Sequence, residues 1–159
     1  MQIKSHIYAF LSALLVQYPV GLAFIAPILV VSSYSLARAV ETVGFYWFAT
    51  TIVAAPIILL IGIPVFHLLR RRGAASKRVL GLAGAVAALA ISAVLTWPIH
   101  SEGFSTGQNY YGVFRDMNID GVPTFWGWVR YVEDLLMFSI HGLLGGMAFG
   151  FGWHKANLK

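Results

Sequence analysis

Two ionisable side chains inside an apolar stretch near the C-terminus are the first candidates for chemistry. Asp134 and His141 are seven positions apart, so a helix would place them on the same face. Polar groups within a bilayer are costly, which makes this pair and the adjacent Glu133 functional candidates. The pair is a candidate for a proton path or a ligand-binding surface. The simpler interpretation is that His141 bonds Ser139 or a backbone carbonyl and fixes helix packing, with Gln17 as a further potential neighbour.

Three other histidines suggest a redox site. His6, His67 and His154 fall at one boundary of three different apolar stretches. Haem b requires two histidines at matched depth on different helices, so haem is a candidate cofactor and a quinone-binding anchor a related alternative. Each of these histidines also lies close to Lys or Arg at the end of its stretch, where an interfacial histidine is ordinary. The ordinary interpretation is the simpler one.

A third candidate is the segment 116–121, Asp-Met-Asn-Ile-Asp-Gly. Side-chain oxygens at alternate positions, from Asp116, Asn118 and Asp120, followed by a glycine, match the first half of a calcium-binding loop. The bidentate Glu that would complete such a loop is replaced by Gly127. An Asp-Gly turn in which the aspartate caps the backbone needs only the same residue types. The segment therefore predicts a turn, with calcium binding as the alternative.

The composition indicates that lipid is the solvent of this chain. Of its 159 residues, 58% are apolar and only 11% are charged, whereas soluble domains carry about 25% charged residues. A small domain cannot hide that much apolar surface in its interior. The net charge of +5 then indicates contact with anionic lipid headgroups rather than with nucleic acid. The chain has no cysteine, which excludes disulfides, thiolate metal sites and cysteine nucleophiles.

Four stretches are long and apolar enough to cross a hydrocarbon core, which needs roughly 20 residues of helix. They cover residues 7–31, 45–69, 79–99 and 129–153. We therefore expect an all-α integral membrane protein, with a single domain in which four transmembrane helices form a bundle. The longest connection, residues 100–128, would form a loop on the outer side.

The distribution of charge predicts the orientation of this bundle. The segment 70–78 carries five basic residues and connects the second stretch to the third. Short basic loops stay in the cytoplasm, so both termini are expected there as well. This arrangement puts eight of the eleven basic residues inside and all six acidic residues outside. We therefore expect a multi-pass protein of a bacterial inner membrane.

Two features are typical of contact surfaces. The outer loop is rich in aromatic residues, which often anchor protein interfaces. The candidates in and beside this loop are Tyr110, Tyr111, Trp126 and Trp128. The fourth stretch carries a groove of glycines four apart, which lets another helix backbone approach closely. These glycines are Gly142, Gly146 and Gly150. Their partner would be the small-residue face of the third stretch, which is the simpler option, or a helix of another protein.

These observations favour a function through contacts rather than through catalysis. The sequence lacks a nucleophile elbow, a phosphate loop, a zinc-type His-Glu motif and a paired-carboxylate site within the apolar stretches. We expect a non-enzymatic complex subunit, assembly factor or toxin-immunity protein whose partner, besides the bilayer, is a membrane or periplasmic protein. The alternatives are a small oligomeric transporter or channel that uses His141 and Asp134, and the haem- or quinone-binding redox anchor.

Overall fold

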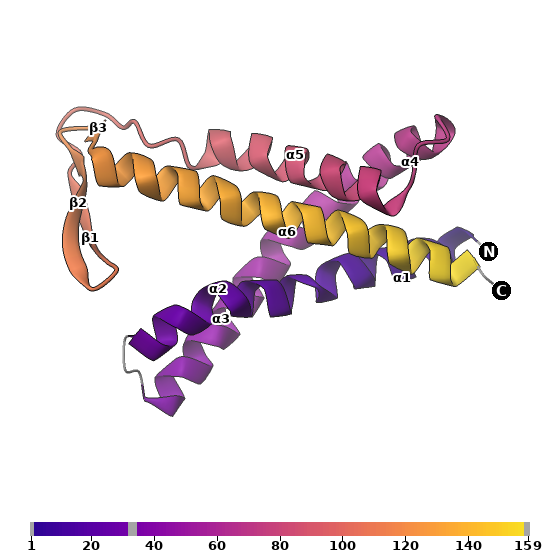
Figure 1. Ribbon diagram of the computed structural model, residues 1–159, viewed down its shortest axis with the longest axis horizontal. Helices are drawn as coiled ribbons and strands as arrows, with labels where there is room; N and C mark the ends of the chain where they lie inside the picture. The colour runs from indigo at the N-terminus through magenta and orange to yellow at the C-terminus, as the bar shows by residue number, and fades with distance from the viewer. Residues whose placement is uncertain (1, 32–34, 158–159) are drawn as a thin grey trace.

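The chain folds into long helices with a small sheet at one end (Figure 1). The computed structural model describes residues 2–31 and 35–157, so Lys159, one of the basic residues assigned to the inner side, lies outside the described part. The helices are α1 (Gln2–Leu15), α2 (Gln17–Val31), α3 (Leu36–Ile57), the π-helical turn η1 (Ile58–Gly62), α4 (Ile63–Arg71), α5 (Lys77–Leu95) and α6 (Phe125–Asn157). The strands are β1 (Thr106–Tyr110), β2 (Val113–Ile119) and β3 (Val122–Pro123).

Four helical stretches are long and apolar enough to cross a membrane, by length and composition. They are Ile3–Pro27, Leu36–Arg71, Lys77–Leu95 and Phe125–Asn157. Each contains most of one predicted stretch, so this part of the prediction is confirmed. The second begins at Leu36 rather than at residue 45, because Ser35 caps it. The Ser35 hydroxyl oxygen accepts a hydrogen bond of 3.4 Å from the Arg38 N–H, and the helix continues through the polar residues that follow.

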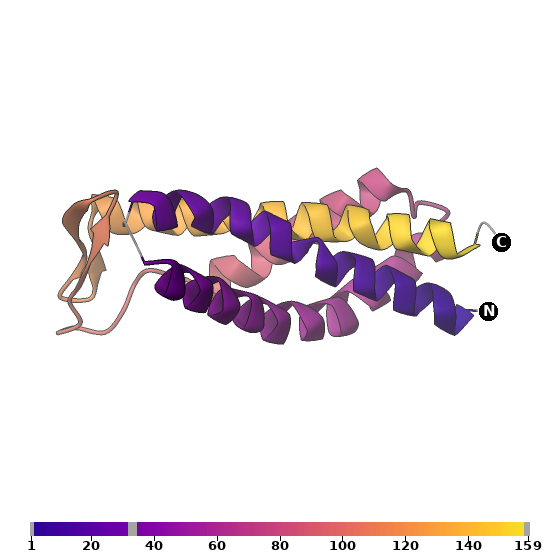
Figure 2. The same cartoon turned by 90° about the horizontal axis from the view of Figure 1, so that it is seen from below.

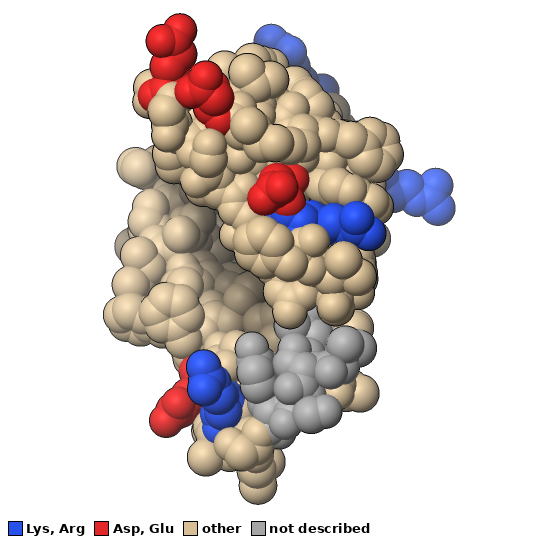
Figure 3. Space-filling view, turned by 90° about the vertical axis from the view of Figure 1, so that its left-hand side faces the viewer, with Lys and Arg blue, Asp and Glu red and all other residues tan. Residues whose placement is uncertain are grey.

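The two ends of the molecule differ in character (Figures 1 and 2). Both termini and the basic turn between α4 and α5 lie at one end, and the sheet lies at the other. At the terminal end, Gly73 ends α4 with a φ of +70°, and Ser76 caps α5 by accepting a 3.3 Å hydrogen bond from the Val79 N–H. At the sheet end, Figure 3 shows both acidic and basic side chains and a hollow in the surface. The basic turn and the acid-rich loop thus lie at opposite ends of the fold.

Helix α6 is the axis of the bundle, with α5 packed along one side and α1 along another. Gly142 lies directly against the backbone of Gly84, and a Cβ atom added to Gly146 would come within 3.0 Å of the Gly81 Cα atom. On the other side, a Cβ atom added to Gly152 would come within 2.6 Å of a backbone oxygen of α1. The glycine groove is therefore occupied by α5 of the same chain, which is the first of the two alternatives above.

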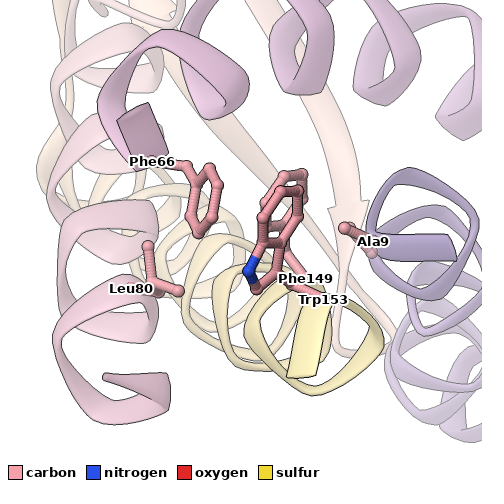
Figure 4. Close-up of a cluster of buried hydrophobic side chains, with 6 residues drawn as sticks. Ala9, Phe66, Leu80, Phe149 and Trp153 are labelled. Carbon is pink, nitrogen blue, oxygen red and sulfur yellow. The ribbon is translucent and has the colours of Figure 1, made fainter. Parts of the chain in front are cut away.

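A cluster of buried hydrophobic side chains joins the helices near the terminal end (Figure 4). Its members come from α1, α4, α5 and α6. They are Ala9, Ala13, Phe66, Leu80, Phe149 and Trp153. The Phe66 side chain is only 1% exposed, and its ring centroid lies 4.6 Å from that of Trp153 and 5.2 Å from that of Phe149. Phe66 therefore attaches α4 to the rest of the bundle.

The second span is interrupted between two prolines. Pro56 lies within α3, Pro64 lies in the first turn of α4, and the π-helical turn η1 falls between them. A proline removes a backbone donor, and π turns often accompany such interruptions. While α4 packs onto the buried cluster, α3 runs away from α5 (Figure 1). In this span only 6% of the most apolar window is buried, so α3 leaves space beside α5 and α6.

Residues 106–123 form a three-stranded antiparallel sheet in the order β1-β2-β3, and the expected all-α class is corrected in this loop. Both of its turns contain two residues with positive φ. These are Tyr111 (49°) with Gly112 (81°), and Asp120 (49°) with Gly121 (80°). Such type I′ turns match the twist of the strands that they join. The predicted Asp-Gly turn is therefore present, and it closes a hairpin.

Thr124 fixes the sheet to the first turn of α6. Its N–H donates to the Met117 carbonyl oxygen at 2.9 Å, and its hydroxyl donates to the Asp116 carbonyl oxygen at 2.6 Å. The same hydroxyl oxygen accepts a 3.2 Å hydrogen bond from the Gly127 N–H, which caps α6. The sheet is thus held against the helix end by backbone groups of β2.

Candidate functional site

Polar side chains from three helices meet in the middle of the bundle. The His141 Nδ1 atom on α6 lies 2.6 Å from Oε1 of Gln17 on α2, and its Nε2 atom lies 3.2 Å from the Tyr46 hydroxyl on α3. A neutral imidazole with its proton on Nδ1 satisfies both contacts, because Nδ1–H donates to the amide oxygen and Nε2 accepts from the phenol. The ring also stacks on Phe24 with a centroid distance of 5.9 Å. We call Gln17, His141 and Tyr46 the polar triad.

Gln17 has partners at both ends of its amide. Its side chain is 6% exposed and lies at the break between α1 and α2. Besides contacting the imidazole, it donates from Nε2 to the Ala13 carbonyl oxygen at 2.9 Å, and the His141 carbonyl oxygen lies 3.4 Å from the same nitrogen. A Cβ atom added to Gly145 would come within 2.6 Å of this nitrogen, so the glycine makes room for the amide. His141 thus bonds neither Ser139 nor a carbonyl through its ring, contrary to the simpler expectation.

A cavity of about 510 Å³ lies beside the triad, between α3 and the α5–α6 pair. All three triad residues line it, and most of its remaining wall is aliphatic. The π-helical turn contributes to this wall through Ile58, Ile61 and Gly62. The volume lies within the roughly 300–1,000 Å³ of typical ligand sites, which combine apolar walls with a few convergent polar groups.

The structure separates Asp134 from His141. Asp134 pairs with Arg130 one turn earlier on α6, with 2.9 Å between Oδ1 and the guanidinium nitrogen. Glu133 accepts a 3.1 Å hydrogen bond from the Tyr111 hydroxyl in the first hairpin turn. At a helical rise of ~1.5 Å per residue, Asp134 and His141 are roughly 10 Å apart along the axis. The two carboxylates therefore belong to the sheet end, and His141 belongs to the cavity.

At the terminal end, the structure brings His6 and His67 together. Their Nε2 atoms are 3.0 Å apart, so one ring donates a hydrogen bond to the other. A metal ion held between two imidazoles needs these atoms about 4 Å apart when the bonds oppose each other, since each bond is about 2 Å. His154 is exposed, and no contact places it with this pair. The histidine pair packs instead beside Trp153, whose ring lies 4.8 Å from that of His6.

The calcium-like segment is extended along the second hairpin. Asp116 and Asn118 lie on β2, while Asp120 occupies the turn and accepts a hydrogen bond from the Gly103 N–H. Asn118 is 7% exposed and donates weakly to the Thr106 hydroxyl at 3.5 Å. Within residues 2–31 and 35–157, no three His, Cys, Asp or Glu side chains form a group that could hold a metal ion.

The aromatic interface candidates divide into buried and exposed residues. Tyr110 is 7% exposed and packs against Trp126, over which the Arg115 guanidinium lies 4.6 Å from the ring centroid. Tyr111 is 81% exposed and Trp128 is 40% exposed. Burial raises the pKa of the Tyr110 phenol, and the hydrogen bond to the Glu133 carboxylate raises the pKa of Tyr111. Tyr110 and Trp126 therefore hold the sheet in place, while Tyr111 and Trp128 remain accessible.

Tyr46 is the functional candidate that the sequence analysis missed. A span that begins at residue 45, as the sequence predicts, would put Tyr46 at the membrane boundary, where an interfacial aromatic is ordinary. Because α3 begins at Leu36, Tyr46 lies more than two turns into the helix, where its hydroxyl reaches His141. The capping residue Ser35 was the signal that could have placed it.

Comparison of the chain with protein families, curated proteins and solved structures finds no match. Its function is therefore inferred from its own geometry, chiefly from the polar triad and the cavity that the triad lines.

Proposed function

We propose that this chain is a four-span membrane protein that binds a lipophilic molecule in the cavity beside the polar triad and acts without catalysing a reaction. The observation that carries the proposal is the junction of an aliphatic cavity of about 510 Å³ with the convergent side chains of Gln17, Tyr46 and His141. An apolar tail would fill the aliphatic part. The triad and the side chains of Thr50, Ser92 and Thr96 form the polar part of the wall, where a polar group of the ligand would find hydrogen-bond partners.

The loose packing of α3 supports this proposal. A helix with 6% of its apolar window buried makes few contacts that would close the space against α5 and α6. In a bilayer the hydrophobic effect does not drive helices together, since lipid tails are as apolar as leucine. Lipid or a lipid-like molecule is therefore the expected content of the cavity. The ligand would enter the cavity from the bilayer between α3 and α5, which requires only that these two helices remain apart.

The proposed orientation places the basic turn and both termini in the cytoplasm of a bacterial cell, with the sheet outside the inner membrane. The five basic residues of the turn between α4 and α5, at the end opposite the sheet, support it through the preference of Lys and Arg for the cytoplasmic side. The chain has no cysteine, so a single introduced cysteine is the only thiol that a maleimide can label. Glu102→Cys should react with an impermeant maleimide in intact cells, and Arg72→Cys only after the membrane is opened. The reverse pattern would contradict this orientation.

Photo-crosslinking tests the binding site. The purified protein is mixed with a phospholipid that carries a diazirine in one acyl chain, irradiated and digested. Adducts are expected on cavity residues such as Ile57 and Ile91, and they should diminish when unlabelled lipid is added in excess. Exposed residues outside the cavity, such as Leu60 and Val94, provide the comparison. Equal labelling of both sets without competition would show only the annular lipid and would remove the proposal.

A second candidate function is contact with another protein through the sheet, as the sequence suggested. Its support is a group of exposed apolar side chains at the sheet end. They are Tyr111 (81%), Phe114 (68%), Val122 (66%) and Phe125 (71%). If this surface binds a membrane or periplasmic partner, Phe114→Ser combined with Phe125→Ser should remove a specific protein that co-purifies in mild detergent. The same proteins retained by this variant would argue against the contact.

A further inference from the structure

A second, polar pocket of about 360 Å³ lies between the sheet and the sheet-side ends of α5 and α6. Its walls include Asn118 of β2 together with Arg130 and Asp134 of α6. These three side chains carry a hydrogen-bonding amide, a cation and an anion. The pocket is thus far more polar than the cavity that the triad lines.

Asn118 has an unfulfilled hydrogen-bonding capacity in this pocket. The residue is 7% exposed, and its Oδ1 atom is buried without a hydrogen-bond partner among the described residues. A buried carbonyl oxygen without a partner costs about 1–3 kcal/mol, so native proteins usually supply one. Because Asn118 lines the pocket, a turn of its amide would bring this oxygen to a ligand with an N–H or O–H group there.

The neighbouring ion pair of Arg130 and Asp134 also has hydrogen-bond donors and an acceptor left over for a ligand. One guanidinium nitrogen of Arg130 contacts Oδ1 of Asp134 at 2.9 Å. A guanidinium has five N–H donors and a carboxylate has two oxygens, so several donors of Arg130 and the Oδ2 acceptor of Asp134 remain. The pair therefore presents a positive and a negative group side by side. A ligand with a phosphate next to a primary ammonium carries the complementary arrangement.

The depth of the pocket matches lipid headgroups. Tyr131 lines it, and the Tyr131 ring packs with those of Trp97 and Trp128 at centroid distances of 5.8 and 5.9 Å. Such aromatic clusters collect at the membrane–water interface. Along α6, Tyr131 and Trp153 are roughly 33 Å apart at ~1.5 Å per residue, close to the ~30 Å of a hydrocarbon core. The pocket therefore lies at the boundary of the hydrocarbon on the sheet side.

The polar pocket meets the aliphatic cavity at Thr96, which lines both. The Thr96 hydroxyl donates to the Ser92 carbonyl oxygen at 2.8 Å, so its own bonding is satisfied and it forms a neutral boundary. The two neighbouring spaces would suit an amphiphile, with its polar head in the polar pocket and its apolar chain in the cavity.

We infer that the ligand of the proposed function is a phospholipid of the outer leaflet with a primary ammonium in its headgroup, as in phosphatidylethanolamine. This inference rests on the proposed binding function and adds the identity of the headgroup. The phosphate lies against Arg130, and the ammonium donates to Asp134 and to the unpartnered oxygen of Asn118. The acyl chain passes Thr96 into the cavity.

The same geometry disfavours the two other common headgroups. Phosphatidylcholine carries a quaternary ammonium without N–H groups, so Asn118 would remain without a donor. Phosphatidylglycerol has a net negative charge, and its glycerol offers no cation for Asp134. Selectivity for a primary ammonium is therefore the property that distinguishes this headgroup site from general affinity for lipid.

Native mass spectrometry of the full chain in detergent tests the inference, with the three lipids carrying identical acyl chains as probes. Phosphatidylethanolamine should bind about tenfold more tightly than phosphatidylcholine or phosphatidylglycerol, the difference expected for a lost charged hydrogen bond. Asn118→Leu and Asp134→Asn should each reduce this preference to about twofold or less. Asp134→Asn keeps the size and shape of the side chain on a helix, so the inference can still be tested if the Leu variant disturbs the sheet. Ser105→Ala, in the same loop but outside the pocket, is the control.

The outcomes separate this inference from the proposed function. Equal binding of the three lipids, abolished by the cavity-filling Ala87→Phe, would overturn the headgroup site and leave the cavity intact. A preference for phosphatidylcholine or phosphatidylglycerol would also overturn it, as would a preference for phosphatidylethanolamine that survives both pocket variants. Binding that Ala87→Phe does not change would count against the cavity itself.

Discussion

His141 and Gln17 are 124 residues apart in the sequence, yet Nδ1 of the histidine lies 2.6 Å from Oε1 of the glutamine. This contact joins α2 to α6 at the level of the cavity, and Tyr46 adds α3 to the same point. A single imidazole thus links three helices, and its contact with Tyr46 reaches from α6 to the loosely packed α3. The cavity depends on that arrangement, because the triad fixes where α3 stands relative to α6.

The contact between Gln17 and His141 should be measurable as a coupling energy. Gln17→Leu leaves the imidazole N–H without its acceptor and should lower the free energy of unfolding by about 1–3 kcal/mol. In a double-mutant cycle with His141→Leu, the coupling should be about 1 kcal/mol. Unfolding in mixed micelles provides the measurement.

Tyr18→Phe is the matched control for this cycle. It removes a different hydrogen bond of α2, the one that joins Tyr18 to the Thr51 hydroxyl on α3 at 2.9 Å, without touching the imidazole. Its effect should add to that of His141→Leu. A coupling of Gln17 and His141 no larger than that of the control pair would mean that the 2.6 Å contact contributes nothing specific.

The close packing of α5 on α6 should be sensitive to side-chain volume. Gly146→Leu places four carbon atoms where the backbone of α5 already lies, so the unfolding free energy should fall by about 3 kcal/mol. Gly44→Leu is the control, because nothing lies within 4 Å of a Cβ atom added there. Thermal unfolding in detergent compares the two. Equal stability of both variants would argue against the contact between the helices.

The sequence could predict the spans because a run of about twenty apolar residues is stable mainly inside a bilayer. An even number of spans also predicts that both termini lie at the same end of the molecule as the basic turn. It could also suggest the Gln17–His141 contact, since both residues are polar in apolar surroundings. The sheet was missed because each of its strands is short and its alternation is weak. The pocket around Asn118 was missed for the same reason, since only strand pairing buries that amide against the helix end.

The stability of the second hairpin should depend on Gly121 for two reasons, its positive φ and the backbone atoms packed against it. In Gly121→Ala, an alanine must adopt the left-handed conformation, which destabilises the turn by about 1–2 kcal/mol. The new Cβ atom would also lie 2.7 Å from the His100 carbonyl oxygen. Gly112→Ala has only the unfavourable left-handed conformation, because nothing lies within 4 Å of the added Cβ atom. Amide hydrogen exchange in β2 and β3 should therefore rise more in the Gly121 variant. Equal exchange in the two variants would contradict the packing of this turn against residues 100–101.

The loop phenols predict a loss of sheet stability at high pH. The hydrogen bond to Glu133 raises the pKa of Tyr111 above its ordinary value of 10.0, because the bond requires the protonated phenol. The stabilising contribution is therefore complete below pH 10.0 and is lost as the pH rises from there through the raised pKa. Glu133→Gln should bring the pKa of Tyr111 back toward its ordinary value. Absorbance at about 295 nm, taken as a difference from Tyr111→Phe, follows the titration, and an unchanged pKa in Glu133→Gln would rule out the contact.

The central claim is that a lipophilic molecule occupies the cavity between α3, α5 and α6, and the most direct test is the amount of lipid that stays bound after purification. Ala87 lines the cavity, whereas Ala90 on the same helix faces outward. Ala87→Phe should remove the tightly bound lipid seen by native mass spectrometry of the wild-type protein, and Ala90→Phe should leave it in place. The same lipid retained in equal amount by both variants would contradict the account.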